Sequence, residues 1–287
     1  SALATWFDDN DTDPLNRLQY NNNQIQYIKG RNYIENTPFI YYAGIGNINK
    51  VHEYIQQGVD VNQTTSYGNT ALINASKNGH INVIQLLINT GKVNINAQNK
   101  DGVSALMLAS QEGHFGIIQL LIVNGADVNI ATNNGITALI SASARGHDNI
   151  IELLLQHHAN INAINSDGQS ALFYACENSH IESARSLLEH GADTNIQDND
   201  GITVLMRVSM HGNFNMVQLL LDYNTNLDLQ DNNKVTALMF ASDNGHTEIV
   251  RTLLVHGADI YLRNVERSSA YDVASTQEIK DMIAVYE

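Results

Sequence analysis

The chain has 287 residues, of which 43% are apolar, and it carries 30 acidic against 15 basic side chains, a net charge of −15. With this charge and no basic run, nucleic acids and anionic membranes are not expected partners, because both are bound through Lys and Arg clusters. The single cysteine, Cys176, excludes an intrachain disulfide and cysteine-rich zinc sites, and it suits a reducing compartment such as the cytoplasm. No apolar run approaches the roughly 20 residues that cross a bilayer.

The first 35 residues differ from the rest of the chain. The sequence opens Ser-Ala-Leu-Ala-Thr-Trp without an initiator Met, so we expect it to be a piece of a longer protein or a processed chain. Residues 14–20 and 24–33 fall out of register with the repeat that follows. We predict that these two segments form one or two capping helices and that residues 1–35 are an N-terminal extension or cap; an alternative is that they belong to an upstream domain.

From residue 36 a short motif recurs, in which Thr or Ser is followed by Ala or Pro, or by Val in one repeat, and then by an apolar residue. All but one of these motifs are 33 residues apart, and the exception, at 34, has one residue inserted between Gly91 and Asn96. A Gly-His pair and a Gly-Ala-Asp-Val-Asn segment keep the same phase. The motifs begin at Thr37, Thr70, Ser104, Thr137, Ser170, Thr203, Thr236 and Ser269. A fixed period of this length indicates a repeat architecture.

Each repeat predicts two helices and a hairpin. In the third repeat, Ser104 is placed to cap a first helix and Gly113 permits a turn. The apolar side of a second helix follows, made of Ile117, Ile118, Leu120, Leu121 and Ile122. Gly125 supplies the positive φ that ends the second helix. The Asn-, Asp- and Gly-rich segment that follows is typical of a hairpin. Such a helix pair has apolar sides toward both neighbours, so it folds only as part of a stack.

These motifs resemble those of the ankyrin-repeat family, whose unit contains T-P-L-H-x-A, then G-H, an apolar helix and G-A-D-V-N. The resemblance implies an all-α ankyrin-repeat solenoid with hairpin loops. Seven full helix-turn-helix repeats would span residues 36–265, and residues 266–287 would form a C-terminal capping repeat. Ala replaces the family Pro in most repeats, and His158 and Asn224 replace the turn Gly in two of them.

Eleven histidines raise the question of a metal site. Five of them recur once per repeat, so they cannot converge on one zinc ion, whose ligand atoms lie about 2.1 Å away. We predict instead that each imidazole forms a hydrogen bond near the start of the second helix, a role that Asn47 and Asn213 fill equally well. The five are His80, His114, His147, His180 and His246. No metal or other cofactor is expected.

Catalysis is not expected either. Cys176 has no basic neighbour in its own repeat and occupies a position where the family has a small buried Ala, so we predict an inert buried thiol. There is no Gly-rich phosphate loop and no Gly-x-Ser-x-Gly elbow. The sequence therefore predicts that the chain is not an enzyme.

One Asn recurs in the turn after each second helix. We predict that these amides bond neighbouring hairpins together; the family resemblance offers hydroxylation by an asparaginyl hydroxylase as an alternative. The residues are Asn62, Asn96, Asn129, Asn162 and Asn195.

In proteins that this chain resembles, ligands lie across the concave face made by hairpin tips and first helices. The positions that vary between repeats predict the contact residues, and aromatic and Arg side chains among them would dominate the binding energy. They are Tyr67, Asn74, Val103, Gln111, Ile136, Arg145, Tyr174, Ile202, Arg207, Met210, Val235 and Phe240. The four apolar residues that follow the hairpin Gly or Lys either form an exposed stripe or shield the hairpin from water.

The function expected from the sequence is a cytoplasmic protein–protein interaction module with an adaptor, targeting or scaffold role. We expect the domain to be monomeric and to bind a peptide or helix of a partner protein in the concave groove. The alternative is the substrate-recruiting ankyrin domain of a larger enzyme, including a bacterial effector delivered into the host cytoplasm.

Overall fold

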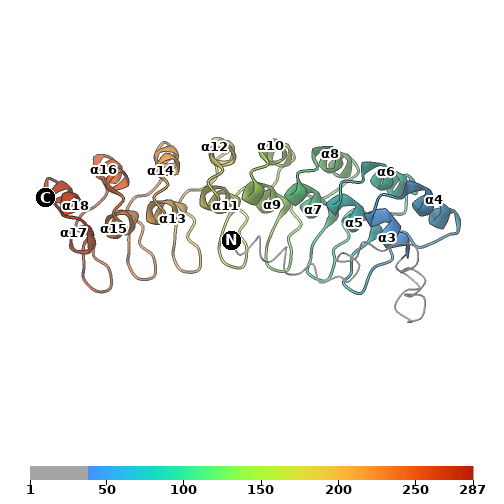
Figure 1. The fold of residues 1–287 in the computed structure, drawn as a ribbon, viewed down its shortest axis with the longest axis horizontal. Helices are drawn as coiled ribbons and strands as arrows, with labels where there is room; N and C mark the ends of the chain where they lie inside the picture. The colour runs from blue at the N-terminus through green and yellow to red at the C-terminus, as the bar shows by residue number, and fades with distance from the viewer. Residues whose placement is uncertain (1–37, 287) are drawn as a thin grey trace. The chain divides into compact units, whose positions relative to one another are not determined.

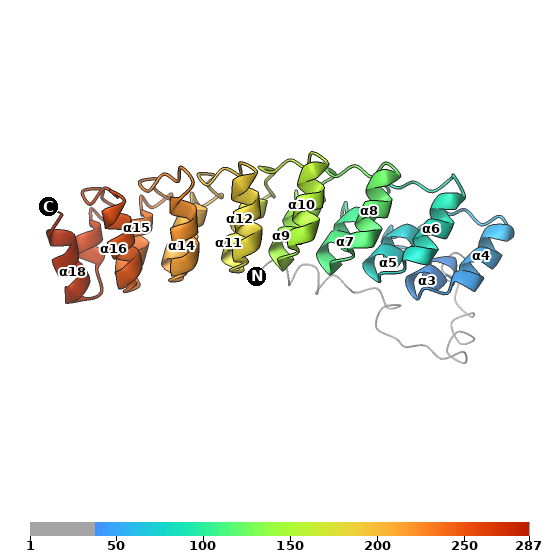
Figure 2. The same cartoon turned by 90° about the horizontal axis from the view of Figure 1, so that it is seen from above.

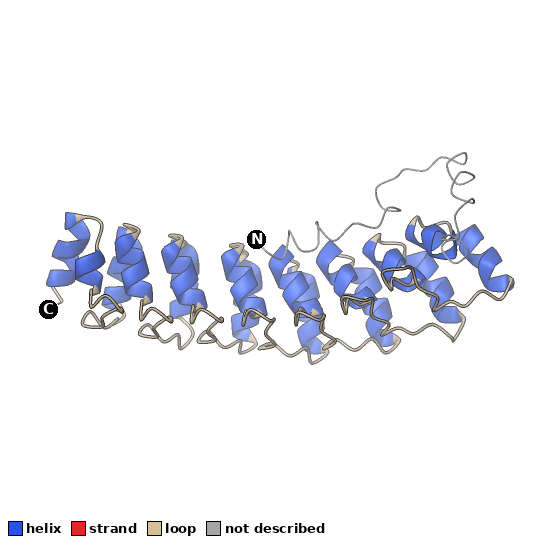
Figure 3. Cartoon of the chain, turned by 90° about the horizontal axis from the view of Figure 1, so that it is seen from below, coloured by secondary structure: helices blue, strands red, loops and turns tan. Residues whose placement is uncertain are grey.

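The structure, a computed structural model, describes residues 38–286. Within that range it contains 16 helices and no strand (Figure 3). The helices of the first four pairs are α3 (Pro38–Gly44), α4 (Ile48–Gln56), α5 (Ala71–Lys77), α6 (Ile81–Asn89), α7 (Ala105–Glu112), α8 (Phe115–Val123), α9 (Ala138–Arg145) and α10 (Asp148–Gln156). The others are α11 (Ala171–Glu177), α12 (Ile181–Glu189), α13 (Val204–Met210), α14 (Phe214–Leu221), α15 (Ala237–Asp243), α16 (Thr247–Val255), α17 (Ala270–Val273) and α18 (Gln277–Ala284).

These helices form seven pairs and a shorter final pair, α17 and α18, within the described residues. The predicted all-α ankyrin-repeat fold with about seven helix-turn-helix repeats and a C-terminal cap is therefore confirmed. The capping helices predicted for residues 1–35 lie outside the described residues.

The described residues divide into two compact blocks, an N-terminal block of residues 38–133 and a C-terminal block of residues 134–286. In the N-terminal block, the first helices α3, α5 and α7 pack side by side, and α4, α6 and α8 form a second layer on them. In the C-terminal block the same two layers consist of α9, α11, α13, α15 and α17 and of α10, α12, α14, α16 and α18. Figure 1 shows the hairpins extending from the first-helix layer of each block, and Figure 2 shows the second helices from above.

The first helices begin where the Thr and Ser motif predicts. Each hydroxyl accepts a hydrogen bond from the backbone N–H three residues later, at 3.2 or 3.3 Å. The capping residues are Thr70, Ser104, Thr137, Ser170, Thr203, Thr236 and Ser269. Such a cap stabilises a short helix by about 1 kcal/mol.

Small side chains on the first helices allow these helices to approach closely. Ala105 and Ala109 of α7 are fully buried, as are Ile118 and Leu121 of α8, which packs against α7. Cys176 falls in a column of buried serines, which are Ser76, Ser110, Ser143, Ser209 and Ser242. The predicted buried thiol is confirmed by its exposure of 1%, and burial raises its pKa.

The two positions that replace the turn glycine keep its left-handed backbone. His158 has a φ of 65° and Asn224 a φ of 36°. Both side chains accept this conformation more readily than β-branched residues do, so the repeat continues through these departures.

Candidate functional site

Each hairpin is bonded to the next one along the chain. Asp198 shapes one hairpin from within, since its Oδ1 accepts from the N–H groups of Asp200 at 3.0 Å and Ile202 at 2.8 Å. The backbone N–H of Asn232 then donates to the carbonyl of Asp200 at 3.0 Å. Because the hairpins support one another in this way, side chains near their bases are covered by the neighbouring hairpin.

The recurring turn Asn also bridges neighbours. The Nδ2 of Asn96 donates to the carbonyl of Gly125 at 3.1 Å, and its Oδ1 accepts from the N–H of Asp127 at 2.9 Å. The amides that likewise bond to the next turn are those of Asn62, Asn162 and Asn195. The predicted bridging role is confirmed for these four residues.

The recurring histidines were predicted to form hydrogen bonds near the start of their own second helix, and this prediction is wrong. The Nε2 atom of His114 lies 3.0 Å from the carbonyl oxygen of Lys77, and that of His246 lies 3.0 Å from the carbonyl oxygen of Met210. Lys77 and Met210 are the last residues of α5 and α13, which are the first helices of the preceding repeats. The ring extends toward that neighbour, so its far nitrogen does not reach the amides of its own helix.

Asparagine at the same position behaves differently. The Oδ1 of Asn47 accepts from Lys50 N–H at 3.1 Å, and that of Asn213 accepts from Met216 N–H at 3.3 Å. Asn therefore caps its own helix, whereas His114 and His246 form no such cap and bond to the preceding repeat. Among residues 38–286, no group of three or more His, Cys, Asp or Glu side chains could hold a metal ion.

Five of the predicted contact residues are buried, each at most 7% exposed: Val103, Gln111, Ile136, Tyr174 and Ile202. The exposed apolar stripe is therefore wrong for the three aliphatic residues of this set, which shield the base of the hairpin. Val103 N–H, for example, donates to Asn99 Oδ1 inside the hairpin at 2.9 Å. Residues in this position cannot contact a partner in the folded state.

Tyr174 was expected at the surface, but its hydroxyl accepts a hydrogen bond from Asn165 Nδ2 at 3.0 Å. Burial, with a smaller contribution from the carboxylates of Glu177 and Asp167, raises the pKa of this phenol to about 12. The Asn165 amide that donates this bond lies on the hairpin that precedes α11. Side-chain type alone does not reveal that partner.

We expect the absorbance of the Tyr174 phenolate to appear near pH 12 in the folded chain, above the pKa of about 10 that is usual for a tyrosine. A raised pKa means that the neutral form is favoured in the folded state. Stability from this group is thus complete below the unfolded pKa and is lost between about pH 10 and pH 12. Difference spectra against Tyr174→Phe measure it; a late phase that persists in this variant would contradict the assignment.

The other seven predicted residues remain accessible. Tyr67 and Arg145 are exposed, and Asn74, Arg207, Met210, Val235 and Phe240 are half-buried. Whether they contact a partner stays a prediction.

Arg207 is the most constrained of these side chains. Its guanidinium carbon lies 5.3 Å from the centroid of the Phe173 ring, and its Nη2 lies 3.7 Å from Asp198 Oδ2. The arginine is 24% exposed, and the aspartate 5%. These contacts hold a large cationic side chain in one place on the first-helix surface of the C-terminal block.

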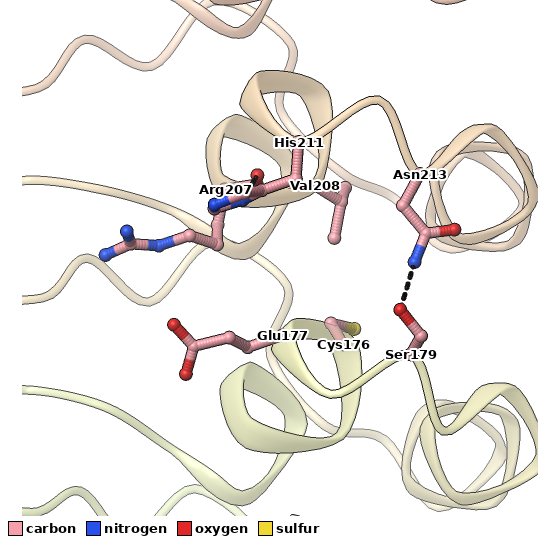
Figure 4. A pocket seen from close by; sticks show the side chains of 7 residues that line it. All are labelled: Cys176, Glu177, Ser179, Arg207, Val208, His211 and Asn213. Atoms are coloured by element: carbon pink, nitrogen blue, oxygen red, sulfur yellow. Dashed lines mark hydrogen bonds between the residues drawn. The ribbon is translucent and has the colours of Figure 1, made fainter. Parts of the chain in front are cut away.

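A cavity beside Arg207 was missed by the sequence analysis. It has a volume of about 300 Å³ and opens between the C-terminal ends of α11 and α13 (Figure 4). Its lining consists of Cys176, Glu177, Ser179, Arg207, Val208, His211 and Asn213. The available signal was the departure from Gly-His at Ser179 and at Asn213, two repeat positions that become neighbours only in the folded stack.

The described helices include none with the length and apolar character of a membrane span. No curated protein sequence matches the chain. Among solved structures, it is similar to the crystal structure of the ankyrin repeat domain of Bcl-3, described as a unique member of the IkappaB protein family. The TM-score is 0.70 at 29% sequence identity, and the match covers 76% of this chain and 99% of that one. Residues 39–132, 115–198 and 187–264 match the family model for ankyrin repeats in three copies, and the chain therefore belongs to the ankyrin-repeat family.

Proposed function

We propose that this chain binds a partner polypeptide on the first-helix surface of its C-terminal block, where it acts as an adaptor, targeting or scaffold module. Ankyrin repeats are a protein-interaction fold, and the fold alone does not choose the partner. The surface residues Arg207, Met210 and Phe240 come from the neighbouring helices α13 and α15 and stay half-exposed among buried framework residues.

The observation that carries the proposal is the fixed position of Arg207. Arg and aromatic side chains supply most of the binding energy at protein interfaces when they can be desolvated. A side chain already held by Phe173 and Asp198 loses less conformational entropy on binding than a free one. Arg207, Met210 and Phe240 are of the side-chain types that are enriched at protein interfaces.

The same surface would serve an alternative role as the substrate-recruiting domain of a larger enzyme, including a bacterial effector delivered into host cells. For both roles we propose a cytoplasmic domain that binds its partner as a monomer. The remaining sequence of the gene separates them, because a catalytic domain would lie outside this chain.

We expect Met210→Glu with Phe240→Glu to weaken binding of the partner by about tenfold or more, since two half-buried apolar contacts are replaced by charges. The immobilised chain captures partners from a lysate, and the dissociation constant of each captured protein is then measured for both forms. A matched control, Asn149→Glu with Gln218→Glu, changes exposed residues of the second helices α10 and α14. Equal affinity of the two double variants, with equal melting temperatures, would place the interface elsewhere.

A further inference from the structure

At most repeat junctions an imidazole fills the space beside the turn between the two helices of the preceding repeat. A Cβ atom added to Gly79 would lie 2.9 Å from the ring of His114, and one added to Gly212 would lie 2.6 Å from the ring of His246. Each ring also bonds to a carbonyl at the end of the preceding first helix. The Gly and the His thus form a matched pair, since the ring requires a residue without a side chain.

The junction between α11 and α13 lacks this pair. Ser179 stands where the turn Gly is found, with a φ of 60°, and Asn213 stands where the His is found. The Nδ2 of Asn213 donates to Ser179 Oγ at 2.8 Å. The Ser179 side chain would collide with an imidazole, and the shorter Asn213 avoids the collision. The 300 Å³ cavity lies at the junction where the ring is missing (Figure 4).

The missing imidazole leaves an acceptor without its donor. The carbonyl oxygen of Glu177 is equivalent to those of Lys77, Ala144 and Met210, each of which lies 3.0–3.3 Å from an imidazole nitrogen. No donor among the described residues bonds to the Glu177 carbonyl. This oxygen is one of the carbonyls that a helix leaves unsatisfied at its C-terminus, and an N–H group is its natural partner.

The charges at the cavity favour a cation. Figure 4 shows the carboxylate of Glu177 and the guanidinium of Arg207 at the end of the cavity opposite the Ser179–Asn213 bond. Arg207 is paired with Asp198, whereas Glu177 forms no ion pair within the described chain. Residues 134–287 carry 20 of the 30 acidic side chains and 8 of the 15 basic ones, a net charge of −12. The field around this block therefore attracts a basic partner segment.

We propose, on the basis of the function proposed above, that the α11–α13 cavity receives a Lys or Arg side chain of the partner. The aliphatic stem packs against Cys176 and Val208 in the interior. The charged end donates hydrogen bonds to the carboxylate and the backbone carbonyl of Glu177. The partner's side chain thereby takes the place that an imidazole occupies at the neighbouring junctions, and its position selects a basic segment over a neutral one.

A displayed library of random short peptides, selected on the full chain, tests the proposal. The comparison variant is Ser179→Gly with Asn213→His, which restores the framework pair and fills the cavity with an imidazole. We expect selected peptides to share one Lys or Arg position. Their affinity should fall about tenfold or more in the filled variant and in Glu177→Gln, and changing the shared Lys to Gln should add no further loss there.

The controls separate occupancy of the cavity from loss of folding. The filled variant should melt at or above the temperature of the original chain, because glycine relieves the positive φ at position 179. Asp243→Asn removes an exposed carboxylate at the equivalent position of α15 and should leave the affinity unchanged.

Three results would overturn the proposal: enriched peptides without a shared basic position, peptides that bind the filled variant as tightly, or no peptide enriched over the filled variant. Acidic peptides would instead indicate recognition by Arg207. Peptides that keep their affinity for the filled variant and lose it in Met210→Glu with Phe240→Glu would reject the cavity and uphold the proposed function.

Discussion

Replacement of Gly201 by Ala is expected to lower the free energy of unfolding by about 2–4 kcal/mol, because a strained backbone angle and a steric collision act together. Gly201 has a φ of 78°. A Cβ atom there would lie 2.8 Å from the backbone nitrogen of Asn232 and 2.9 Å from the Cα of Asp231. These are backbone atoms of the next hairpin, so the hairpins must move apart and strain the bond between Asn232 N–H and the Asp200 carbonyl.

The matched control is Gly191→Ala in the same block. Gly191 has a φ of 86°, but an added Cβ would meet no atom within 4 Å. Only the backbone term remains, which amounts to about 1–2 kcal/mol. Urea denaturation of the two variants measures the difference. Equal losses of stability would show that contact between hairpins contributes nothing beyond the angle itself.

The features that were predicted correctly from the sequence depend on residues within one repeat or on the fixed spacing between repeats. Ser104 caps its helix because the acceptor and the amide are three residues apart on one turn. The bridge made by Asn96 follows from the regular recurrence of the turn Asn. Because such patterns recur at a fixed spacing, the fold can be predicted from them without knowing which distant residues are in contact.

The wrong predictions concern side chains that contact a neighbouring repeat or the hairpin of their own repeat. Ile136 and Ile202 follow a hairpin glycine and were among the predicted contact residues, but both are buried. The His114 ring was assigned to its own helix, whereas it reaches the carbonyl of Lys77 in the preceding repeat. Composition could not reveal these contacts, because they depend on the distance between stacked elements.

The cavity could have been suspected from two departures from the Gly-His motif, considered together. Ser179 and Asn213 were each visible in the sequence as substitutions in a regular column. Their significance comes from the collision between a side chain at the first position and an imidazole at the second, which only the packed junction reveals. Repeats in one chain therefore act as internal controls for one another, and paired departures point to sites that a single column hides.

Leu220→Ala is expected to cost about 2–5 kcal/mol of unfolding free energy, since it removes a fully buried side chain and leaves a cavity. Leu220 of α14 has no exposed surface, and the helix packs against α13, α12 and α16. Its neighbour Leu221 is half-buried, so Leu221→Ala should cost clearly less with the same change in helix propensity. Equilibrium denaturation compares the two, and equal costs would contradict the burial assigned to Leu220.

The loss at Leu220 should also spread along the stack. A repeat is stabilised mainly by its two neighbours, so weakening α14 lowers the free energy of opening α13 and α16 as well. Hydrogen exchange should therefore accelerate in α13 before the protected amides of α9 respond. Since α13 carries Arg207 and Met210, Leu220→Ala should weaken partner binding without changing a surface residue. Exchange that accelerates in α14 alone would mean that each repeat is held by its own contacts, and binding would then be independent of the core of the adjacent helix.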